Sequence, residues 1–275
     1  MGAAGGGAVT VHLVGAGPGA ADLLTLRAVD LLTRADLVLY PGTYLDEAVL
    51  GHCRASARLV DTQALDLDTM VALMVDADAR GERVVRLTSG DPSLYSALHE
   101  QGARLDAAGV AWSVVPGVPA YAAAAALVGR ELTVPLVAQS VVLTRTQARS
   151  TAMPATESLE AFAATGATLV LHLAITRVRE LLERLTPTHG PDCPVVVVHR
   201  ASQPGELVLR GTVGGATCVA DAVEAHDLRQ AAVVLVGRAL ADPDTTAGQV
   251  AGESYLYSRE RRRLRAGEEP PSSTG

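Results

Sequence analysis

The sequence predicts an α/β protein of two domains, with a mostly parallel sheet in the first half of the chain and a mixed sheet in the second. Short apolar runs alternate with helical patterns, which is typical of parallel strands joined by helices. In the second half, two apolar runs flank the turn residues 203–205, a hairpin signal that makes one pairing antiparallel. With 275 residues, 48% of them hydrophobic, the chain can bury one large or two medium cores.

Four apolar runs predict the strands of the first domain, which we place at residues 9–117. The strands are expected at 9–14, 37–40, 84–87 and 112–115. Apolar residues at i, i+3 and i+4 predict helices at 26–34, 69–80 and 93–108. Asp68 is a candidate N-cap of the second helix, and Gly81 is its stop. Residues 1–8, rich in glycine and alanine, are expected to form a flexible tail.

An alanine-rich helix at 120–128, closed by Gly129, is expected within a linker at 118–135. The second domain then covers residues 136–245. Its strands are expected at 137–143, 168–173, 195–199, 206–212 and 232–236, and its helices at 159–164, 177–185 and 216–225. Residues 246–275 form an extension that we expect to be disordered from about 258, because few of its residues are apolar.

Composition predicts a cytoplasmic protein without a nucleic-acid partner. The net charge is -7, which argues against nucleic-acid binding. The apolar runs are far shorter than the roughly 20 residues of a membrane span, and the N-terminal segment lacks the features of a signal peptide. Cys53, Cys193 and Cys218 form no C-x-x-C pair, and the seven histidines lack ligand spacing. We therefore expect neither a disulfide framework nor a bound metal.

Three glycine-proline segments mark a predicted ligand site. They are GAGPG at 15–19, TSGDP at 88–92 and PGVPA at 116–120, and each follows a predicted strand and precedes a helical pattern. In α/β sheets such turns form the rim of small-molecule sites.

The first turn also satisfies the dinucleotide fingerprint G-x-G-x-x-G/A through Gly15, Gly17 and Ala20. Two features argue against an NAD or FAD site. Pro18 removes an N–H from the stretch that would hold a pyrophosphate, and Asp22 adds a carboxylate near the same place. The acid that would bind a ribose is also missing from the end of the second strand.

The three turns, in this order and at these separations, resemble those of the tetrapyrrole methylase family, whose members transfer a methyl group from S-adenosylmethionine (SAM). The similarity continues through VVLTR at 141–145, TLVLHL at 168–173, VVHRASQP at 197–204 and VLVGRAL at 234–240, and covers about residues 9 to 245. Within the family, LYPGTYLD at 39–46 and LTRTQAR at 143–149 are most similar to members that methylate C11 of precorrin-4 in cobalamin biosynthesis.

The resemblance implies a two-domain fold with SAM in the cleft between the domains. Carried over position by position, the cofactor contacts fall on Pro18, Gly90, Asp91, Leu94, Pro119, Ala120, Leu173, Ala201 and Leu240. A carboxylate such as Asp91 can accept from the SAM amino group. Pro119 stands where the family often has a threonine or serine, so a hydroxyl contact is lost there.

Candidate substrate residues are fewer and lie near the predicted strand ends. They are Asp22, Tyr44, Asp46, Arg145 and Arg149. Asp46 can instead cap a helix at 47–51. Arginine forks suit the carboxylate arms of a tetrapyrrole, and all 23 basic residues here are arginine. Relatives that act on uroporphyrinogen carry an acid where this chain has Pro41, so the resemblance assigns no catalytic residue.

The implied reaction is attack of C11 of precorrin-4, or of its cobalt form, on the SAM methyl group. The products are precorrin-5 and S-adenosylhomocysteine, and the resemblance implies a homodimer. Three alternatives stay open: methylation at another ring carbon such as C2, C17 or C20, a protein methylase like diphthine synthase, and a SAM-binding protein without catalysis.

Overall fold

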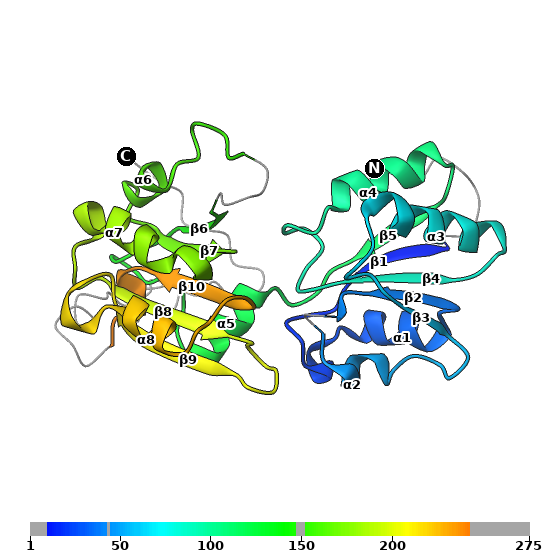
Figure 1. Cartoon of the computed structure of the whole chain (residues 1–275), viewed down its shortest axis with the longest axis horizontal. Coiled ribbons are helices and arrows are strands. Elements are labelled where there is room, and N and C mark those ends of the chain that lie inside the picture. The colour runs from blue at the N-terminus through cyan, green and yellow to red at the C-terminus, as the bar shows by residue number, and fades with distance from the viewer. Residues whose placement is uncertain (1–9, 43–44, 147–151, 243–275) are drawn as a thin grey trace, which may run out of the picture.

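The computed structural model describes residues 10–42, 45–146 and 152–242. The expected N-terminal tail and C-terminal extension lie outside these residues. Two five-stranded sheets form two lobes that lie side by side (Figure 1). None of the described helices is long and apolar enough to span a membrane.

The first lobe contains a parallel sheet with strand order β3-β2-β4-β1-β5. Its elements are β1 (Val11–Gly15), η1 (Ala21–Leu23), α1 (Leu26–Arg34), β2 (Leu37–Tyr40), α2 (Glu47–Leu50), β3 (Arg58–Asp61), α3 (Leu67–Ala79), β4 (Val84–Thr88), α4 (Leu98–Ala107) and β5 (Trp112–Val115). The parallel sheet predicted for this half is confirmed.

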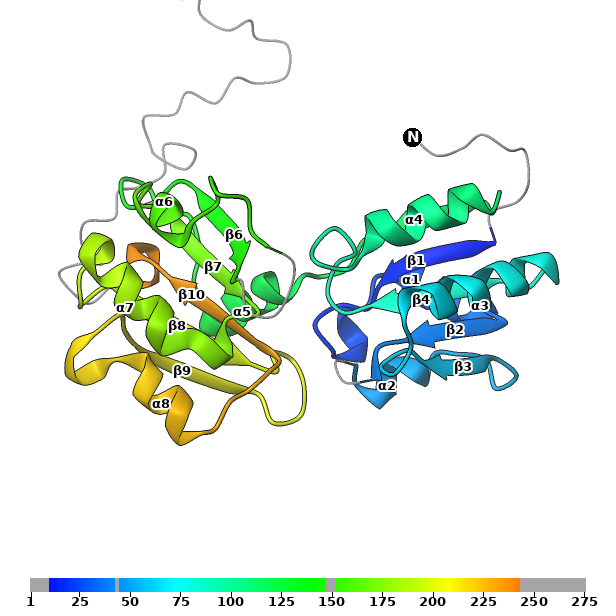
Figure 2. The same cartoon turned by 45° about the horizontal axis from the view of Figure 1, so that its top comes forward.

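Helices cover both faces of the first sheet (Figure 2). One face packs against α1 and α2, and the opposite face packs against α3 and α4. The connection that leaves β1 therefore crosses one face, and the connection that leaves β4 crosses the other. Because β1 and β4 are neighbours, their carboxyl ends flank a topological switch point, where α/β sheets bind ligands.

The second lobe contains a mixed sheet with strand order β6-β7-β10-β8-β9. Its elements, with the preceding helix, are α5 (Ala120–Val128), β6 (Val141–Arg145), α6 (Leu159–Ala163), β7 (Thr168–His172), η3 (Ile175–Arg177), α7 (Val178–His189), β8 (Pro194–His199), β9 (Leu207–Thr212), η4 (Gly215–Thr217), α8 (Val219–Ala225), β10 (Ala232–Val236) and η5 (Arg238–Leu240). Strands β6 and β7 pair in parallel, whereas the other pairings are antiparallel. The predicted hairpin is the β8–β9 pair.

The alanine-rich helix α5 follows the strand that ends the first lobe but packs on the second sheet. Ala123, Ala124 and Val128 lie in one buried cluster with Val196 and Val233. Small side chains allow this close approach. In both views α5 lies on the side of the second lobe that faces the first (Figures 1 and 2).

Some element boundaries differ from the sequence prediction. Helix α3 begins two residues earlier than expected, with Asp66 rather than Asp68 as its N-cap. Helix α4 begins at Leu98 instead of 93, because Tyr95 and Ala97 adopt positive φ angles that interrupt a helix. The edge strand β3 was not predicted, since its exposed residues give no apolar run.

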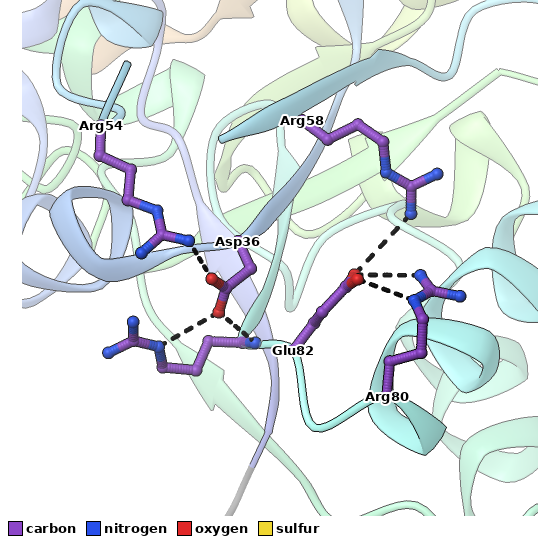
Figure 3. A network of polar contacts seen from close by, with 6 residues as sticks. Asp36, Arg54, Arg58, Arg80 and Glu82 are labelled. Carbon is purple, nitrogen blue, oxygen red and sulfur yellow. Dashed lines mark hydrogen bonds and ion pairs between the residues drawn. The ribbon is translucent and has the colours of Figure 1, made fainter. Parts of the chain in front are cut away.

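Ion pairs occupy the amino-terminal end of the first sheet, opposite the glycine turns (Figure 3). Asp36, just before β2, accepts from the Arg83 backbone N–H at 2.8 Å and pairs with Arg54. That backbone bond is the main interaction that lowers the Asp36 pKa. Glu82 receives two bonds from Arg80, at 2.7 and 3.0 Å. Positive charges at this end therefore have acidic partners.

Candidate functional site between the two lobes

The three glycine turns meet at the carboxyl end of the first sheet. Gly17 and Gly90 exchange backbone hydrogen bonds of 3.1 and 2.7 Å, which join the first turn to the second. The Asp91 carboxylate accepts from the Gly117 N–H at 2.8 Å, which joins the second turn to the third. Segments that are far apart in sequence thus form one rim.

Gly117 and Gly15 allow these backbones to touch. A Cβ on Gly117 would lie 2.3 Å from the Gly90 carbonyl oxygen and 2.8 Å from the Gly15 Cα. A Cβ on Gly15 would lie 2.5 Å from the Gly117 nitrogen. Any side chain at either position would push the turns apart.

Asp91 is held by its own lobe. Its Oδ1 accepts from the Ser93 backbone N–H at 2.8 Å and from the Ser93 hydroxyl. Burial by itself raises the pKa of Asp91, but the hydrogen bonds from Ser93 and Gly117 outweigh it and hold the pKa below its usual value. The carboxylate is therefore ionised at neutral pH, and its hydrogen bonds connect the second turn to the third.

The β8–β9 loop of the second lobe closes over the first turn. The Gln203 side-chain amide donates to the Pro18 carbonyl at 2.5 Å, and the Ser202 hydroxyl accepts from the Ala20 N–H at 3.3 Å. At another point of contact, the rings of Tyr95 and His172 lie 5.5 Å apart. These contacts hold the two lobes on either side of a cleft.

The cleft contains a cavity of about 590 Å³ that is lined by both lobes. Eight of the nine predicted cofactor residues line it: Pro18, Gly90, Asp91, Leu94, Pro119, Ala120, Leu173 and Ala201. The ninth, Leu240, is 4% exposed and packs in the core beside Ala201, behind the wall of the cavity. The structure thus brings together residues that span more than 180 positions of sequence.

Unusual backbone conformations concentrate at this cavity. Of the eight described non-glycine residues with positive φ, five line it: Tyr95, Ala97, Leu173, Arg200 and Ala231. Leu173, with φ of 53°, is 63% exposed although it is a large apolar side chain. Residues in such conformations cost stability and cluster at functional sites.

The polar residues that line the cavity but were not predicted from the sequence include Arg86 and His172. Arg86 is only 8% exposed, and the available signal was an arginine in the middle of an apolar strand. His172 ends β7, and burial lowers its pKa, so its imidazole is neutral at pH 7. Its Nε2 is buried and has no hydrogen-bond partner among the described residues.

The predicted substrate residues are not gathered in this cavity. Asp22 is exposed in η1, and Tyr44 and Arg149 lie outside the described residues. Asp46 caps α2, with Oδ1 accepting from the Ala48 N–H at 2.8 Å, which is the alternative that the sequence left open. Arg145 ends β6, directly opposite His172 in the parallel register, and lines a neighbouring cavity of about 700 Å³.

Fold and cavity together define a two-lobed α/β protein with a cavity between its lobes. The chain belongs to the tetrapyrrole (corrin/porphyrin) methylases, because that family model matches residues 10–217. The resemblance inferred from the glycine turns is confirmed.

Individual relatives are similar over nearly the whole chain. A precorrin-4 C(11)-methyltransferase of Rhodococcus erythropolis is 49% identical over 93% of this chain and 99% of the relative. A solved cobalt precorrin-4 methyltransferase of cobalamin biosynthesis superposes with a TM-score of 0.80 at 36% identity, over 84% of this chain and 96% of that one. A uroporphyrin-III C-methyltransferase of Thermus thermophilus, solved with S-adenosylhomocysteine, superposes with a TM-score of 0.67 at 29% identity. The match covers 84% of this chain and 92% of that one.

Proposed function

We propose that this chain is a SAM-dependent methyltransferase that methylates C11 of precorrin-4, giving precorrin-5 in cobalamin biosynthesis. The observation that carries the proposal is the 49% identity, over 93% of this chain, with a protein named for that reaction. The segments at 39–46 and 143–149 resemble the same member of the family. An identity this high over the full length favours a shared reaction over a shared fold alone.

The cavity suits a SAM molecule. Pro119, Ala120, Leu173 and Ala201 provide apolar surface for an adenosine, and Gly90 lines the same cavity without a side chain. These residues, with Pro18, Asp91 and Leu94, are the proposed cofactor contacts. A solved relative that carries S-adenosylhomocysteine has the same fold, which supports this choice.

When bound, SAM supplies a methyl group on a positively charged sulfur. The protein's contribution is to align the attacking carbon, the methyl group and the sulfur, and such positioning can contribute several kcal/mol. The hydrogen bonds among the three turns make this side of the cavity rigid. The hydrogen bond from Gln203 to the Pro18 carbonyl holds the second lobe against it. A rigid frame rather than a strong acid or base is what this chemistry requires.

We also propose that the protein works in the cytoplasm as a homodimer, as its resemblance to the family implies. Leu26 and Leu136 are 90% and 84% exposed, and burial in a subunit interface would remove them from water. Light scattering during size-exclusion chromatography tests the dimer.

The reaction is tested by incubating the purified protein with methyl-labelled SAM and precorrin-4, with precorrin-2 and precorrin-3 in parallel. The position of the label on the macrocycle is then read by NMR. We expect label at C11 of precorrin-4. Label at another carbon would keep the family and overturn the position of methylation.

Tight S-adenosylhomocysteine binding without transfer to any precorrin would overturn the reaction and favour a protein substrate or a non-catalytic role. A parallel incubation with cobalt-precorrin-4 compares the two forms of the substrate. The relatives include one named for precorrin-4 and one named for cobalt precorrin-4, so both forms are candidate substrates. We take the form with the higher kcat/KM to be the physiological substrate.

A further inference from the structure

Arg86 is a buried cation that has no acidic partner in the described part of the chain. It lies on β4, a central strand of the first sheet, and its side chain is 8% exposed. Its Nη1 donates to the Leu87 carbonyl, and its Nε is buried with no hydrogen-bond partner among residues 10–42, 45–146 and 152–242. Among the described residues no carboxylate pairs with it.

The arginines at the other end of the same sheet differ from Arg86 in having acidic partners. Arg54, Arg80 and Arg83 are far more exposed than Arg86, yet each has an acidic partner. A buried charge without a counter-ion costs much more than an exposed one, so folding alone does not explain Arg86. Burial lowers its pKa to about 10, and the guanidinium still remains protonated at pH 7.

The place of Arg86 links it to the proposed site. It lines the cavity between the lobes together with Thr88, two residues further along the same strand. The charged residues lining the described part of the cavity are Arg86, Arg200, Arg229 and a single carboxylate, Asp91. The oxygens of Asp91 already accept from Gly117 and Ser93. Arg229 pairs with Asp227, so Arg86 and Arg200 are the positive charges through which the cavity wall favours an anion, although the whole chain carries a charge of -7.

We propose that Arg86 is a carboxylate-binding residue of the cleft, whose counter-ion is supplied by the ligand. A guanidinium presents donors in a planar fork that fits a carboxylate. The inference rests on the proposed function, which offers two carboxylate sources: the amino-acid end of SAM and the acetate or propionate arms of the tetrapyrrole.

The test compares Arg86→Met with wild type and with Arg83→Met, which removes a paired arginine outside the cavity. Calorimetry measures the affinity for S-adenosylhomocysteine and for methylthioadenosine, which lacks the amino-acid end. Anaerobic absorbance titration measures the affinity for precorrin-2, precorrin-3 and precorrin-4. Urea unfolding gives the stability of each variant.

We expect Arg86→Met to weaken one class of ligand by at least about tenfold while its unfolding midpoint stays at or above that of wild type. Loss for S-adenosylhomocysteine but not for methylthioadenosine identifies the SAM carboxylate as the partner. Loss for a precorrin alone identifies a substrate arm. Arg83→Met should change the midpoint little, because its ion pair is exposed, and leave all affinities unchanged.

Unchanged affinity for every ligand, with or without a lower midpoint, would overturn the proposal and leave Arg86 as a structural residue. If Arg86→Met does not fold, the same affinities are measured for Arg86→Lys, which keeps the positive charge but loses the planar pair of guanidinium donors. Failure of the proposed function would give a different result: the wild-type protein would bind S-adenosylhomocysteine but methylate no precorrin.

Discussion

A methyl group added at Gly117 should damage the ligand site more than the fold. The Cβ of Gly117→Ala would lie 2.3 Å from the Gly90 oxygen and 2.8 Å from the Gly15 Cα, whereas ordinary contact begins at 3.4 Å. The turns must therefore separate by about 1 Å, and overpacking of this kind costs about 1–3 kcal/mol. Since all the neighbours are backbone atoms, we expect the upper end of that range.

Gly109 provides the matched control. It follows α4 with φ of 71°, and a Cβ there would meet nothing within 4 Å. Gly109→Ala should therefore cost about 1–2 kcal/mol through its left-handed backbone alone. Both variants lose stability, but only Gly117→Ala alters the rim of the cavity.

Urea unfolding measures the stability of both variants, and calorimetry measures their affinity for S-adenosylhomocysteine. We expect Gly117→Ala to bind at least about tenfold more weakly and Gly109→Ala to bind like wild type. Wild-type affinity in Gly117→Ala would refute the reasoning, because the cavity would then not depend on the contact between the three turns. Equal loss of affinity in both variants would refute it too, since general destabilisation would then suffice.

Three further predictions concern other residues of the site and its surroundings. Asp46→Ala should cost about 1 kcal/mol of stability by removing the α2 cap, whereas Asp46→Asn keeps the cap; a raised KM for precorrin-4 in the asparagine variant would show that Asp46 binds substrate instead. Because burial lowers the pKa of His172, the unfolded chain takes up a proton near pH 6.5 before the folded one does. The free energy of unfolding should therefore fall as the pH drops below 6.5, and less so in His172→Phe; identical pH profiles would contradict this. Gln203→Ala should weaken S-adenosylhomocysteine binding and speed amide exchange in the first turn, and unchanged exchange would show that the bond to Pro18 does not hold that turn.

The framework of the first lobe could be predicted because local and global signals agree there. The strands at 37–40 and 112–115 and the helix at 26–34 have the bounds that their apolar patterns predicted. Glycine turns at strand ends then placed three segments at one edge, since the ends of parallel strands meet there. In the second lobe, the turn residues at 203–205 were enough to identify the hairpin.

The departures from prediction have tertiary causes. The helix predicted from 93 begins at Leu98, because residues before it adopt the positive φ angles of the cavity wall. The carboxylate of Asp91 accepts a hydrogen bond from the N–H of Gly117, 26 positions away, and no local sequence pattern predicts such a bond. Arg86 is a charge within an apolar run, and only the strand order, which puts β4 between β1 and β2, shows that it is buried.

These departures point to one property of the cleft. Positive φ angles, backbone contacts that exclude a side chain and an arginine with no counter-ion among the described residues each lower the stability of the unliganded fold. None of them serves the packing of either core, since the cores are formed by aliphatic clusters behind the cavity wall. In the part of the chain that the structure describes, these three features occur together at the cavity between the lobes. A sequence selected for stability alone would remove them one by one, so their coincidence with the predicted cofactor residues supports the proposed ligand site in this cavity.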